Sequence, residues 1–411
     1  MELYIHIPFC VRKCAYCDFL SAPADQDTIA RYMERLKEQL VQQAAFLRDR
    51  NQELATKTGI QTGIQTGIQT GIQAAADTVN ATMIDTVFIG GGTPTILHAW
   101  QLEDLLHTIQ NNYALAENVE FTVEANPGTL TPGKARALAA GGVNRVSLGL
   151  QSACEQELRL LGRIHTYEDF LKSYELVREA GITNLNVDLM SALPGQTLSS
   201  YEKTLQKVLL LHPQHISAYS LIIEEDTPFY EQYREDERLR DAGEIPRLLP
   251  DEESERAMYE LTGEMLAAHG YERYEISNYA RPGYECRHNI GYWTGEPYLG
   301  VGLGASSYID ACRYCNTSDL DAYLAGDFSA YERQQLSKED RMAEFFYLGL
   351  RMTRGVEKAA FVQRFGMRAE QVYGEVLAQL VGQHLLEDTG SGYRFTPYGR
   401  DVSNQVLYRF L

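Results

Sequence analysis

The sequence predicts an α/β protein with a partial (β/α)6 TIM-type barrel, a C-terminal α+β unit and a winged-helix-like unit. Three observations predict this fold class. The chain has 411 residues, which at about 150 residues per domain indicates two or three folded units rather than one core. Short β-rich runs alternate with helical stretches through the first half, as is typical of a parallel sheet. The alternation stops after about residue 223, so the later part folds differently.

Six β-rich runs define the predicted barrel, residues 1–223. They are Glu2–Pro8, Ile84–Gly90, Val119–Ala125, Asn144–Leu150, Thr183–Ser191 and Gln214–Ile222. Between the first two runs, residues Thr28–Leu47 carry apolar side chains close to a helical period, which predicts a covering helix. Six strand–helix repeats therefore predict a curved parallel sheet that closes part of a barrel.

A low-complexity insertion at about 51–80 interrupts the predicted barrel. Residues Gly59–Gln73 repeat the unit GIQT, with no period that would form a core. Glycine at every fourth position raises the backbone entropy that is lost on ordering. We expect a mobile surface excursion whose deletion leaves activity intact.

Two further units are predicted in the second half. Residues 224–335 form a connecting α+β unit, in which an acidic, helix-prone stretch precedes an aromatic- and glycine-rich segment. Residues 336–411 show two helical patterns, Phe345–Met352 and Val372–Val381, before a β-hairpin that turns at Gly390–Gly392. Helices followed by a hairpin indicate a winged-helix-like unit. It lacks a basic recognition-helix pattern, so we expect packing or partner docking and no nucleic-acid binding.

The charge balance excludes several classes of function. The chain has 37 basic and 56 acidic residues and a net charge of −19, which disfavours non-specific binding to nucleic acid or an anionic membrane as its main activity. It has no basic start followed by an apolar run, and no stretch of the roughly 18 apolar residues that a membrane span needs. We therefore expect a cytoplasmic protein without a transmembrane segment.

Seven cysteines, an odd number without a signal peptide, argue against a disulfide framework and for metal binding or reactive thiols. Cys10, Cys14 and Cys17 crowd into one loop directly after the first β-rich run. Thiolates are preferred ligands of iron–sulfur clusters and zinc, and three of them on one loop can wrap a compact cluster. They leave one iron of a cubane without a protein ligand, an open Lewis-acidic position that an amino-acid head group can fill. A structural zinc with a remote fourth ligand is the alternative.

Polar or glycine-rich residues stand at the carboxyl ends of four predicted strands: Gly90–Thr93, Glu124, Gln151 and Asp188. Parallel α/β folds place their chemistry at that edge. The glycines of Gly90–Thr95 can offer backbone N–H groups to a carboxylate, and this segment lacks the Lys-Ser/Thr ending of a phosphate loop. Glu124 can accept hydrogen bonds from ribose hydroxyls or an ammonium group. The alternatives are ordinary loop polarity or a salt bridge at Glu124 or Asp188.

The C-x3-C-x2-C loop, with an aromatic residue before its last cysteine, resembles that of the radical S-adenosylmethionine (SAM) superfamily. The resemblance implies that Cys10, Cys14 and Cys17 hold a [4Fe-4S] cluster, whose fourth iron is chelated by the methionine amine and carboxylate of SAM. It also implies an electron donor, because one-electron reduction cleaves the sulfonium to give methionine and a 5′-deoxyadenosyl radical.

Nearly the whole chain outside the insertion resembles the coproporphyrinogen III dehydrogenase-like group. The motifs are Tyr4–Cys10, Gly90–Thr95, Leu148–Ser152, Asp188–Thr197 and the C-terminal unit. Two branches of that group compete, and both imply porphyrin metabolism. One is the oxygen-independent dehydrogenase, a radical enzyme that oxidatively decarboxylates propionate side chains. The other is a heme chaperone, which binds heme and passes it to an acceptor hemoprotein.

Three features favour the heme chaperone branch over an active dehydrogenase. Cys17 is followed by Asp18 and Phe19, where the dehydrogenase pattern has a further cysteine. The first strand begins at the second residue, without the N-terminal extension of the dehydrogenase. His288–Trp293 matches the HNxxYW motif associated with heme binding in the chaperone branch. Imidazole can ligate heme iron and the aromatic side chains offer flat faces to a porphyrin, although a hydrogen-bonded core element is the alternative.

The resemblance also implies ligand contacts residue by residue. They are Tyr4, Gly91, Gly92, Thr93 and Glu124 for a first SAM, Tyr16, Gln151, Arg163, Asp188 and Ile222 for a second, and His288, Asn289, Tyr292 and Trp293 for heme. Arg163 can equally pair with an acidic neighbour or a heme propionate. Cys312 and Cys315 form a lone C-x2-C pair, for which incidental buried thiols are favoured over a redox or cluster role.

Overall fold

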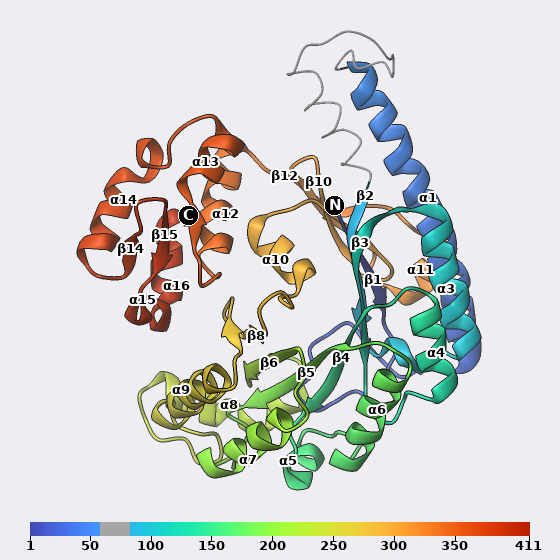
Figure 1. Cartoon of the computed structure of the whole chain (residues 1–411), viewed down its shortest axis with the longest axis horizontal. Helices are drawn as coiled ribbons and strands as arrows, with labels where there is room; N and C mark the ends of the chain where they lie inside the picture. Colours follow the sequence, from blue (N-terminus) through green and yellow to red (C-terminus); the bar gives the residue numbers. More distant parts are fainter. Residues whose placement is uncertain (58–82) are drawn as a thin grey trace.

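The computed structural model describes residues 1–57 and 83–411 (Figure 1). Its centre is a curved parallel sheet of six strands that neighbour each other in chain order. They are β1 (Glu2–Ile7), β2 (Met83–Gly91), β3 (Ala114–Ala125), β4 (Arg145–Gln151), β5 (Asn184–Ser191) and β6 (His215–Ser220). Each predicted β-rich run forms one of these strands, so the predicted α/β fold class with a partial barrel is confirmed.

Helices cover the outer face of this sheet. They are α1 (Gln26–Lys57), the short η1 (Pro94–Ile96), α3 (Ala99–Asn112), α4 (Pro132–Ala140), α5 (Glu155–Leu160), α6 (Tyr167–Glu179) and α7 (Leu198–Leu209). Leu3, Ile5 and Ile7 of β1 are buried in one core with α1. Because side chains alternate along a strand, Tyr4 and His6 face the inside of the barrel. The packing therefore leaves the polar residues of each strand on its inner face.

Helix α1 extends beyond the predicted helix Thr28–Leu47 and ends at Lys57. The predicted insertion at about 51–80 therefore begins too early, because residues 51–57 continue the helix. Favourable helix formers in this stretch, such as Gln52 and Glu53, explain the extension. The GIQT repeat, Gly59–Gln73, lies outside the described residues.

The sheet continues past both edges of the six-stranded barrel. At one edge β9 (Tyr298–Val301) pairs parallel to β1 and leads to the antiparallel strands β10 (Ser306–Ile309), β11 (Cys312–Cys315) and β12 (Tyr331–Gln335). At the other edge, β8 (Asn278–Ala280) and β7 (Glu272–Arg273) follow β6. Strands from 224–335 thus complete one sheet of twelve strands within the described residues. They have two to five residues each, too few for a clear alternating pattern.

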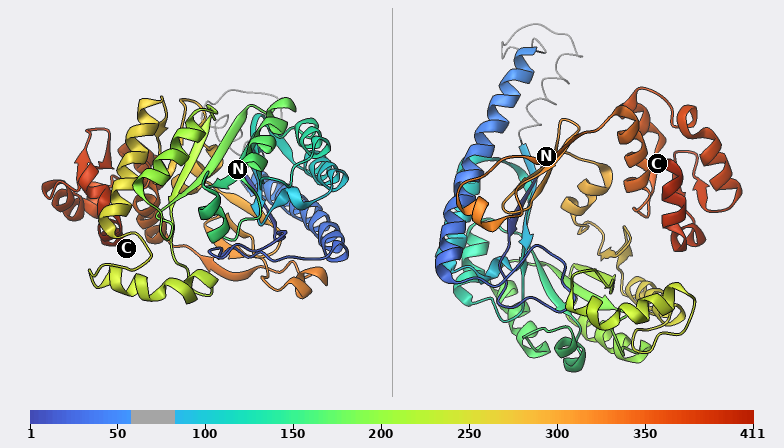
Figure 2. Two further views of the ribbon diagram at one scale, coloured as in Figure 1. Left: turned by 90° about the horizontal axis from the view of Figure 1, so that it is seen from below. Right: turned by 180° about the vertical axis from the view of Figure 1, so that it is seen from behind.

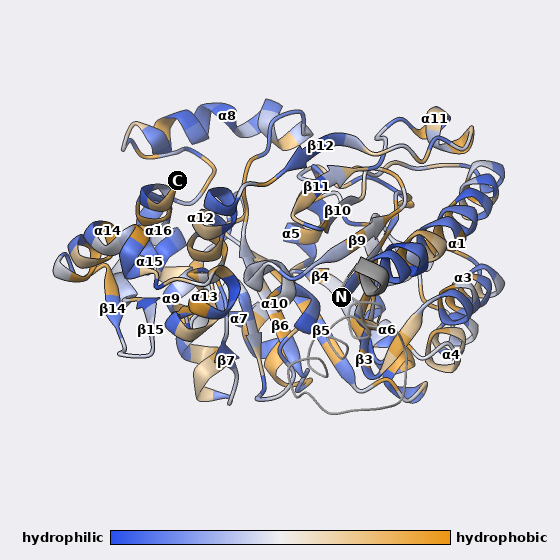
Figure 3. Cartoon of the chain, turned by 90° about the horizontal axis from the view of Figure 1, so that it is seen from above, coloured by the Kyte–Doolittle hydropathy of each residue, from blue (hydrophilic) through white to orange (hydrophobic). Residues whose placement is uncertain are grey.

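Four helices of the second half connect these strands: α8 (Pro228–Asp241), α9 (Glu252–Ala268), α10 (Arg287–Thr294) and α11 (Leu320–Leu324). Helix α8 is coloured mostly as hydrophilic in Figure 3 and lies on the surface. Helix α10 lies on the inner side of the curved sheet, between the sheet and the C-terminal unit (Figures 1 and 2). It contacts both β2 and the first helix of that unit.

The C-terminal unit has its own apolar core, in which Phe346 stacks on Phe410 with ring centroids 4.5 Å apart. Its elements are α12 (Lys338–Gly349), β13 (Val356–Glu357), α13 (Lys358–Phe365), α14 (Glu370–Gly382), β14 (Leu386–Asp388), β15 (Gly392–Phe395), α15 (Pro397–Asp401), α16 (Ser403–Leu407) and η2 (Tyr408–Phe410). The predicted hairpin is present as β14 and β15, beside the additional strand β13. Across the described parts of the chain, none of the helices has both the length and the apolar character that a bilayer span needs.

Candidate functional site

The three cysteines after β1 face one common cavity. Cys10, Cys14 and Cys17 are free thiols, and all three line a cavity of about 370 Å³. Backbone hydrogen bonds hold their loop in place: Cys10 N donates to the carbonyl oxygen of Ala22 at 3.2 Å, and Ala15 N donates to that of Leu161 at 3.0 Å. The local fold therefore brings the predicted ligand set together without any disulfide among the described residues.

Most of the residues predicted to contact SAM surround this cavity, at the carboxyl ends of the barrel strands. Those that line it are Tyr16, Gly91, Gly92, Glu124, Gln151, Arg163 and Asp188. Thr93 lines a small adjoining pocket together with Cys14. Tyr4 and Ile222 line neither pocket. Tyr4 contacts the His6 Nδ1 atom at 2.9 Å, and the side chain of Ile222 is 68% exposed, two residues beyond the end of β6.

The glycine segment after β2 is fastened to the protein itself. Gly91 N donates to Glu124 Oε2 at 3.1 Å. Gly92 N donates to the carbonyl oxygen of Ile7 at 2.8 Å, and Thr93 N to that of Phe9 at 2.7 Å. The expectation that this segment offers its N–H groups to a ligand carboxylate is therefore wrong for these three groups. The carboxylate that one of them binds belongs to Glu124.

Gly91 is required by the approach of β1 to β2. Its φ is +106°, and a Cβ atom there would lie 2.5 Å from the imidazole of His6. Because of that conformation and that short distance, any other residue at position 91 would force the backbone or His6 to move. The glycine thus serves the packing that brings β1, β2 and the cysteine loop to one edge.

Two carboxyl groups face the cavity without an ion pair, although the positive charge of buried Arg145 acts on the pKa of both. Within the described residues neither Glu124 nor Asp188 forms an ion pair, so the alternative of a salt bridge at these positions is not what the structure has. Burial, together with the nearby charge of Asp188, raises the pKa of Glu124 to about 8. Burial also raises the pKa of Asp188, although Ser147 and Asn186 donate to it at 3.0 and 2.7 Å. With this pKa, Glu124 keeps its proton near neutral pH and can both donate to and accept from a ligand hydroxyl.

Arg163 reaches the cysteine loop directly at Cys14, and it reaches Cys10 through Asn126, a residue that the sequence analysis missed. The Arg163 guanidinium donates to Cys14 Sγ at 3.6 Å and to Asn126 Oδ1 at 2.6 Å. Asn126 in turn donates to Thr93 Oγ1 at 2.6 Å, and that hydroxyl donates to Cys10 Sγ at 3.5 Å. The sulfurs of Cys10 and Cys14 thus accept hydrogen bonds from Thr93 and Arg163, which stabilise thiolate charge. Asn126 follows Glu124 by two residues, directly after a predicted strand, and this position could have identified it as a site residue.

The donor set fits an iron–sulfur cluster. Three thiols on one loop face a cavity, with donors to Cys10 and Cys14 arranged around them, as expected for the outer shell of a metal centre. No three Cys, His, Asp or Glu side chains of residues 1–57 and 83–411 gather closely enough to hold a single metal ion. The thiolates of an iron–sulfur core bind separate irons, so they need not converge as closely as the ligands of one ion.

The predicted heme residues lie elsewhere, on α10. His288 is 1% exposed and both of its ring nitrogens are occupied: Nδ1 contacts Thr86 Oγ1 at 2.7 Å, and Nε2 contacts the Tyr292 hydroxyl at 3.0 Å. Thr86 is near the amino end of β2, whereas the cysteine loop lies at the carboxyl ends of the strands. Trp293 lines a separate cleft, and Asn289 is half-buried. The motif therefore fixes α10 against the barrel through His288 and Tyr292, while the half-buried Trp293 lines the separate cleft.

The free energy of unfolding is expected to fall on acidification because of His288. Burial lowers the pKa of this imidazole from 6.5 to about 3, so the folded chain keeps it neutral where the unfolded chain protonates it. A lowered histidine pKa gives stability that is present above pH 6.5 and is lost as the pH falls toward about 3. Urea unfolding at pH 7 and about pH 5 should show wild type losing about 2 kcal/mol more than His288→Gln. Equal losses would contradict this origin of the acid sensitivity.

The remaining cysteines have structural surroundings. Cys312 and Cys315 stand at the two ends of β11, whose pairing with β12 shifts register between Arg313 and Cys315. Cys312 is buried, whereas Cys315 is half-buried with its Sγ 3.8 Å from the carbonyl oxygen of Tyr331. Cys286 is buried before α10 with its Sγ 3.4 Å from Glu120 Oε1, and Cys154 precedes α5. This placement disfavours a shared redox role for the C-x2-C pair.

Profiles of known families match two parts of the chain. The radical SAM superfamily matches residues 71–208, and the HemN C-terminal domain matches residues 336–402. The solved structure of coproporphyrinogen III oxidase (HemN) from Escherichia coli, described as a radical SAM enzyme, covers 100% of this chain and 89% of its own with a TM-score of 0.77. At 22% identity, this likeness shows the fold alone.

Curated relatives match the chain from end to end. The heme chaperone HemW of Lactococcus lactis subsp. lactis (strain IL1403) is 35% identical over 99% of this chain and 96% of the relative. That of Bacillus subtilis (strain 168) is 34% identical over 99% and 98%, and that of Escherichia coli (strain K12) is 31% identical over 100% and 98%. With the matched superfamily profile and the shared fold, these identities confirm the predicted resemblance. The chain belongs to the HemW heme chaperone family of radical SAM proteins.

Proposed function

We propose that this protein binds heme and transfers it to an acceptor hemoprotein, and that a [4Fe-4S] cluster on Cys10, Cys14 and Cys17, with SAM at its open iron, tunes that transfer. The observation that carries the proposal is the convergence of three free thiols and the strand-end carboxyl groups on one cavity. Full-length similarity to curated heme chaperones supports the heme part. When bound, the cluster supplies an open Lewis-acidic iron and a one-electron carrier that an electron donor reduces.

The residues around the cavity have separate tasks in this proposal. Arg163 and Thr93 donate to cysteine sulfurs and stabilise their negative charge. Glu124 and Asp188 face the same space and are suited to hydroxyl and ammonium groups of SAM. The proposed contacts are Tyr4, Gly91, Gly92, Thr93 and Glu124 for a first SAM, and Tyr16, Gln151, Arg163, Asp188 and Ile222 for a second. Of these residues, Tyr4 and Ile222 line neither the cavity nor its adjoining pocket, and Ile222 is exposed.

For heme we propose the cleft beside α10. This helix carries the predicted heme residues His288, Asn289, Tyr292 and Trp293. Trp293 lines a cleft of about 610 Å³ together with Phe345 and Met352 from the C-terminal side. Large flat apolar ligands bind in pockets of this size that aromatic side chains line. His288 contributes by holding α10, because both of its ring nitrogens are already bonded.

Arg354 is the proposed partner of a heme propionate. It lines the same cleft and, in the part of the chain that the structure describes, makes no hydrogen bond or ion pair. Guanidinium groups bind carboxylates through two parallel hydrogen bonds. Glu296 and Glu357 also line the cleft. The other arginine of its described lining, Arg364, already donates to the carbonyl oxygens of Thr294 and Gly295, so Arg354 is the guanidinium left to bind an anionic ligand.

The two tryptophans of the chain allow a direct test of this heme site. Trp293 lines the cleft, whereas Trp100 is 62% exposed near the start of α3 on the outer face of the sheet. In Trp100→Phe, which keeps Trp293, heme titration should quench the remaining fluorescence more strongly than in Trp293→Phe. Trp293→Leu should raise the Kd for heme, followed by the Soret band, by about fivefold.

Stronger quenching of Trp100 than of Trp293 would place heme elsewhere on the protein. Absence of any Soret band with stoichiometric heme would overturn heme binding itself. Arg354→Gln should weaken binding by about fivefold, while Arg409→Gln, an exposed arginine of the same unit that lines none of the pockets described above, should leave the Kd unchanged.

A further inference from the structure

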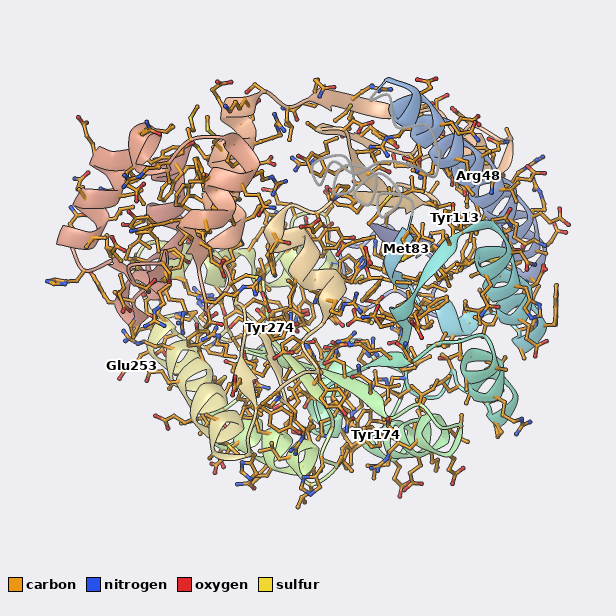
Figure 4. All side chains as sticks on the ribbon, turned by 45° about the horizontal axis from the view of Figure 1, so that its top comes forward. Arg48, Met83, Tyr113, Tyr174, Glu253 and Tyr274 are labelled. Atoms are coloured by element: carbon orange, nitrogen blue, oxygen red, sulfur yellow. The ribbon has the colours of Figure 1, made fainter. Side chains whose placement is uncertain are left out.

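A line of buried hydrogen bonds runs through the barrel from the SAM cavity to α10. Asn186 Nδ2 donates to Asp188 Oδ1 at 2.7 Å, and Asn186 Oδ1 contacts His215 Nδ1 at 2.6 Å. His215 Nε2 contacts the Tyr274 hydroxyl at 2.9 Å, and that oxygen accepts from Cys286 N at 3.2 Å. Asn186, His215, Tyr274 and Cys286 are all at most 8% exposed. Tyr274 lies between the strands and α10 in the middle of the molecule (Figure 4).

The chemistry of the groups fixes the direction of every bond. A carboxylate only accepts, so the amide nitrogen of Asn186 faces Asp188 and its oxygen accepts from His215 Nδ1. Burial lowers the pKa of His215 well below its usual range, so Nε2 carries no proton and accepts from the Tyr274 hydroxyl. The Tyr274 oxygen then accepts from the backbone N–H of Cys286. All donors point toward Asp188, and bonds aligned in this way polarise one another.

The two ends of this line lie at the two sites of the proposed function, the SAM cavity and the helix beside the heme cleft. Asp188 lines the cavity that the cysteine loop faces. Cys286 directly precedes α10, and the next N–H groups, of Arg287 and His288, donate to Glu120 at 2.9 and 3.1 Å. Two acceptors therefore hold the start of α10. Tyr274 is hydrogen-bonded through His215 and Asn186 to Asp188 in the cavity, whereas Glu120 is not part of that line.

We propose that His215 and Tyr274 are positioning residues that couple the occupant of the cavity at Asp188 to the placement of α10, and through α10 to the heme cleft. The identity of the two ligands rests on the function proposed above. A ligand ammonium or hydroxyl that donates to Asp188 draws negative charge away from Oδ1. The Asn186 bond weakens, and with it each bond along the line to Cys286 N. SAM thereby loosens the start of the helix that carries Trp293.

Hydrogen exchange on the anaerobically reconstituted full chain tests the coupling without heme. In wild type, saturating SAM should speed the exchange of the backbone amides of residues 286–294 by at least about threefold. Tyr274→Phe removes one hydroxyl and breaks the line, so exchange in this segment should no longer respond to SAM. Tyr271→Phe is the matched control: Tyr271 is 2% exposed and donates to the carbonyl oxygen of Pro213 at 2.6 Å, outside the line. It should keep the wild-type response.

The outcomes separate the coupling from the function on which it rests. Iron content and equilibrium dialysis of SAM are measured on the same samples, and a wild type that binds no SAM would overturn both. SAM binding with unchanged exchange at α10, or the same response in Tyr274→Phe as in wild type, would overturn the coupling alone. If Tyr274→Phe does not fold, His215→Leu breaks the line one residue further along. In a parallel heme titration, SAM should change the Kd for heme by at least about fivefold in wild type and in Tyr271→Phe. It should leave the Kd for heme unchanged in Tyr274→Phe.

Discussion

A Cys14→Ser variant is expected to retain at most about a tenth of the iron and acid-labile sulfide that wild type holds after anaerobic reconstitution. Cys14 is one of three thiols facing the cavity and accepts a hydrogen bond from Arg163. With two thiolates left, the cluster loses a ligand that no other described cysteine can replace, since the others lie on different elements. SAM binding, measured by equilibrium dialysis, should be lost with the cluster.

The control for this variant is the removal of a thiol away from the cavity. Cys154→Ser and Cys315→Ser each remove one partly exposed thiol from another element. Both should reconstitute to the wild-type iron content and bind SAM. Full iron and sulfide in Cys14→Ser, or zinc in the wild-type loop, would contradict the proposed ligand set.

Glu120→Leu is expected to lower the free energy of unfolding by about 3 kcal/mol. The Glu120 carboxylate accepts the backbone N–H groups of Arg287 and His288 at the start of α10. Leucine leaves both donors without this partner, and each buried unsatisfied donor costs about 1–3 kcal/mol. Urea unfolding of the reconstituted protein measures the loss, and heme affinity should fall as well because α10 is no longer fixed.

Glu117→Leu is the matched control, because Glu117 is an exposed residue of the same strand, β3. Its free energy of unfolding should stay within about 0.5 kcal/mol of wild type. Equal stability of the two variants would show that α10 does not depend on the Glu120 carboxylate.

Local patterns predicted the barrel and much of the site because both follow from regular strand–helix repeats. Gly91, Glu124 and Gln151 stand at or next to the carboxyl end of a strand whose apolar pattern is readable, and the parallel sheet brings them to one edge. Asp188 lies three residues before the end of β5, and its side chain faces the same cavity. Ile222 was placed at the same edge, but β6 ends at Ser220 and the chain has already turned away.

The contacts around α10 could not be predicted, because they join residues far apart in the chain. Glu120 meets Arg287 and His288 across about 170 positions, and Thr86 meets His288 across 202. The HNxxYW motif indicated a functional helix but not that its imidazole is fully bonded inside the protein. The short strands β7–β12 were missed for a different reason, since strands of two to five residues are too short to show an alternating pattern.

Heme transfer tests the central claim most directly. Heme-loaded, anaerobically reconstituted protein is mixed with an apo-hemoprotein, and the same preparation receives SAM, reductant and coproporphyrinogen III in parallel. The proposed function predicts that the Soret band of the acceptor grows as that of this protein declines, with no conversion of the porphyrinogen. Porphyrinogen conversion without movement of heme would contradict it and assign the chain to the oxidative decarboxylation of propionates instead.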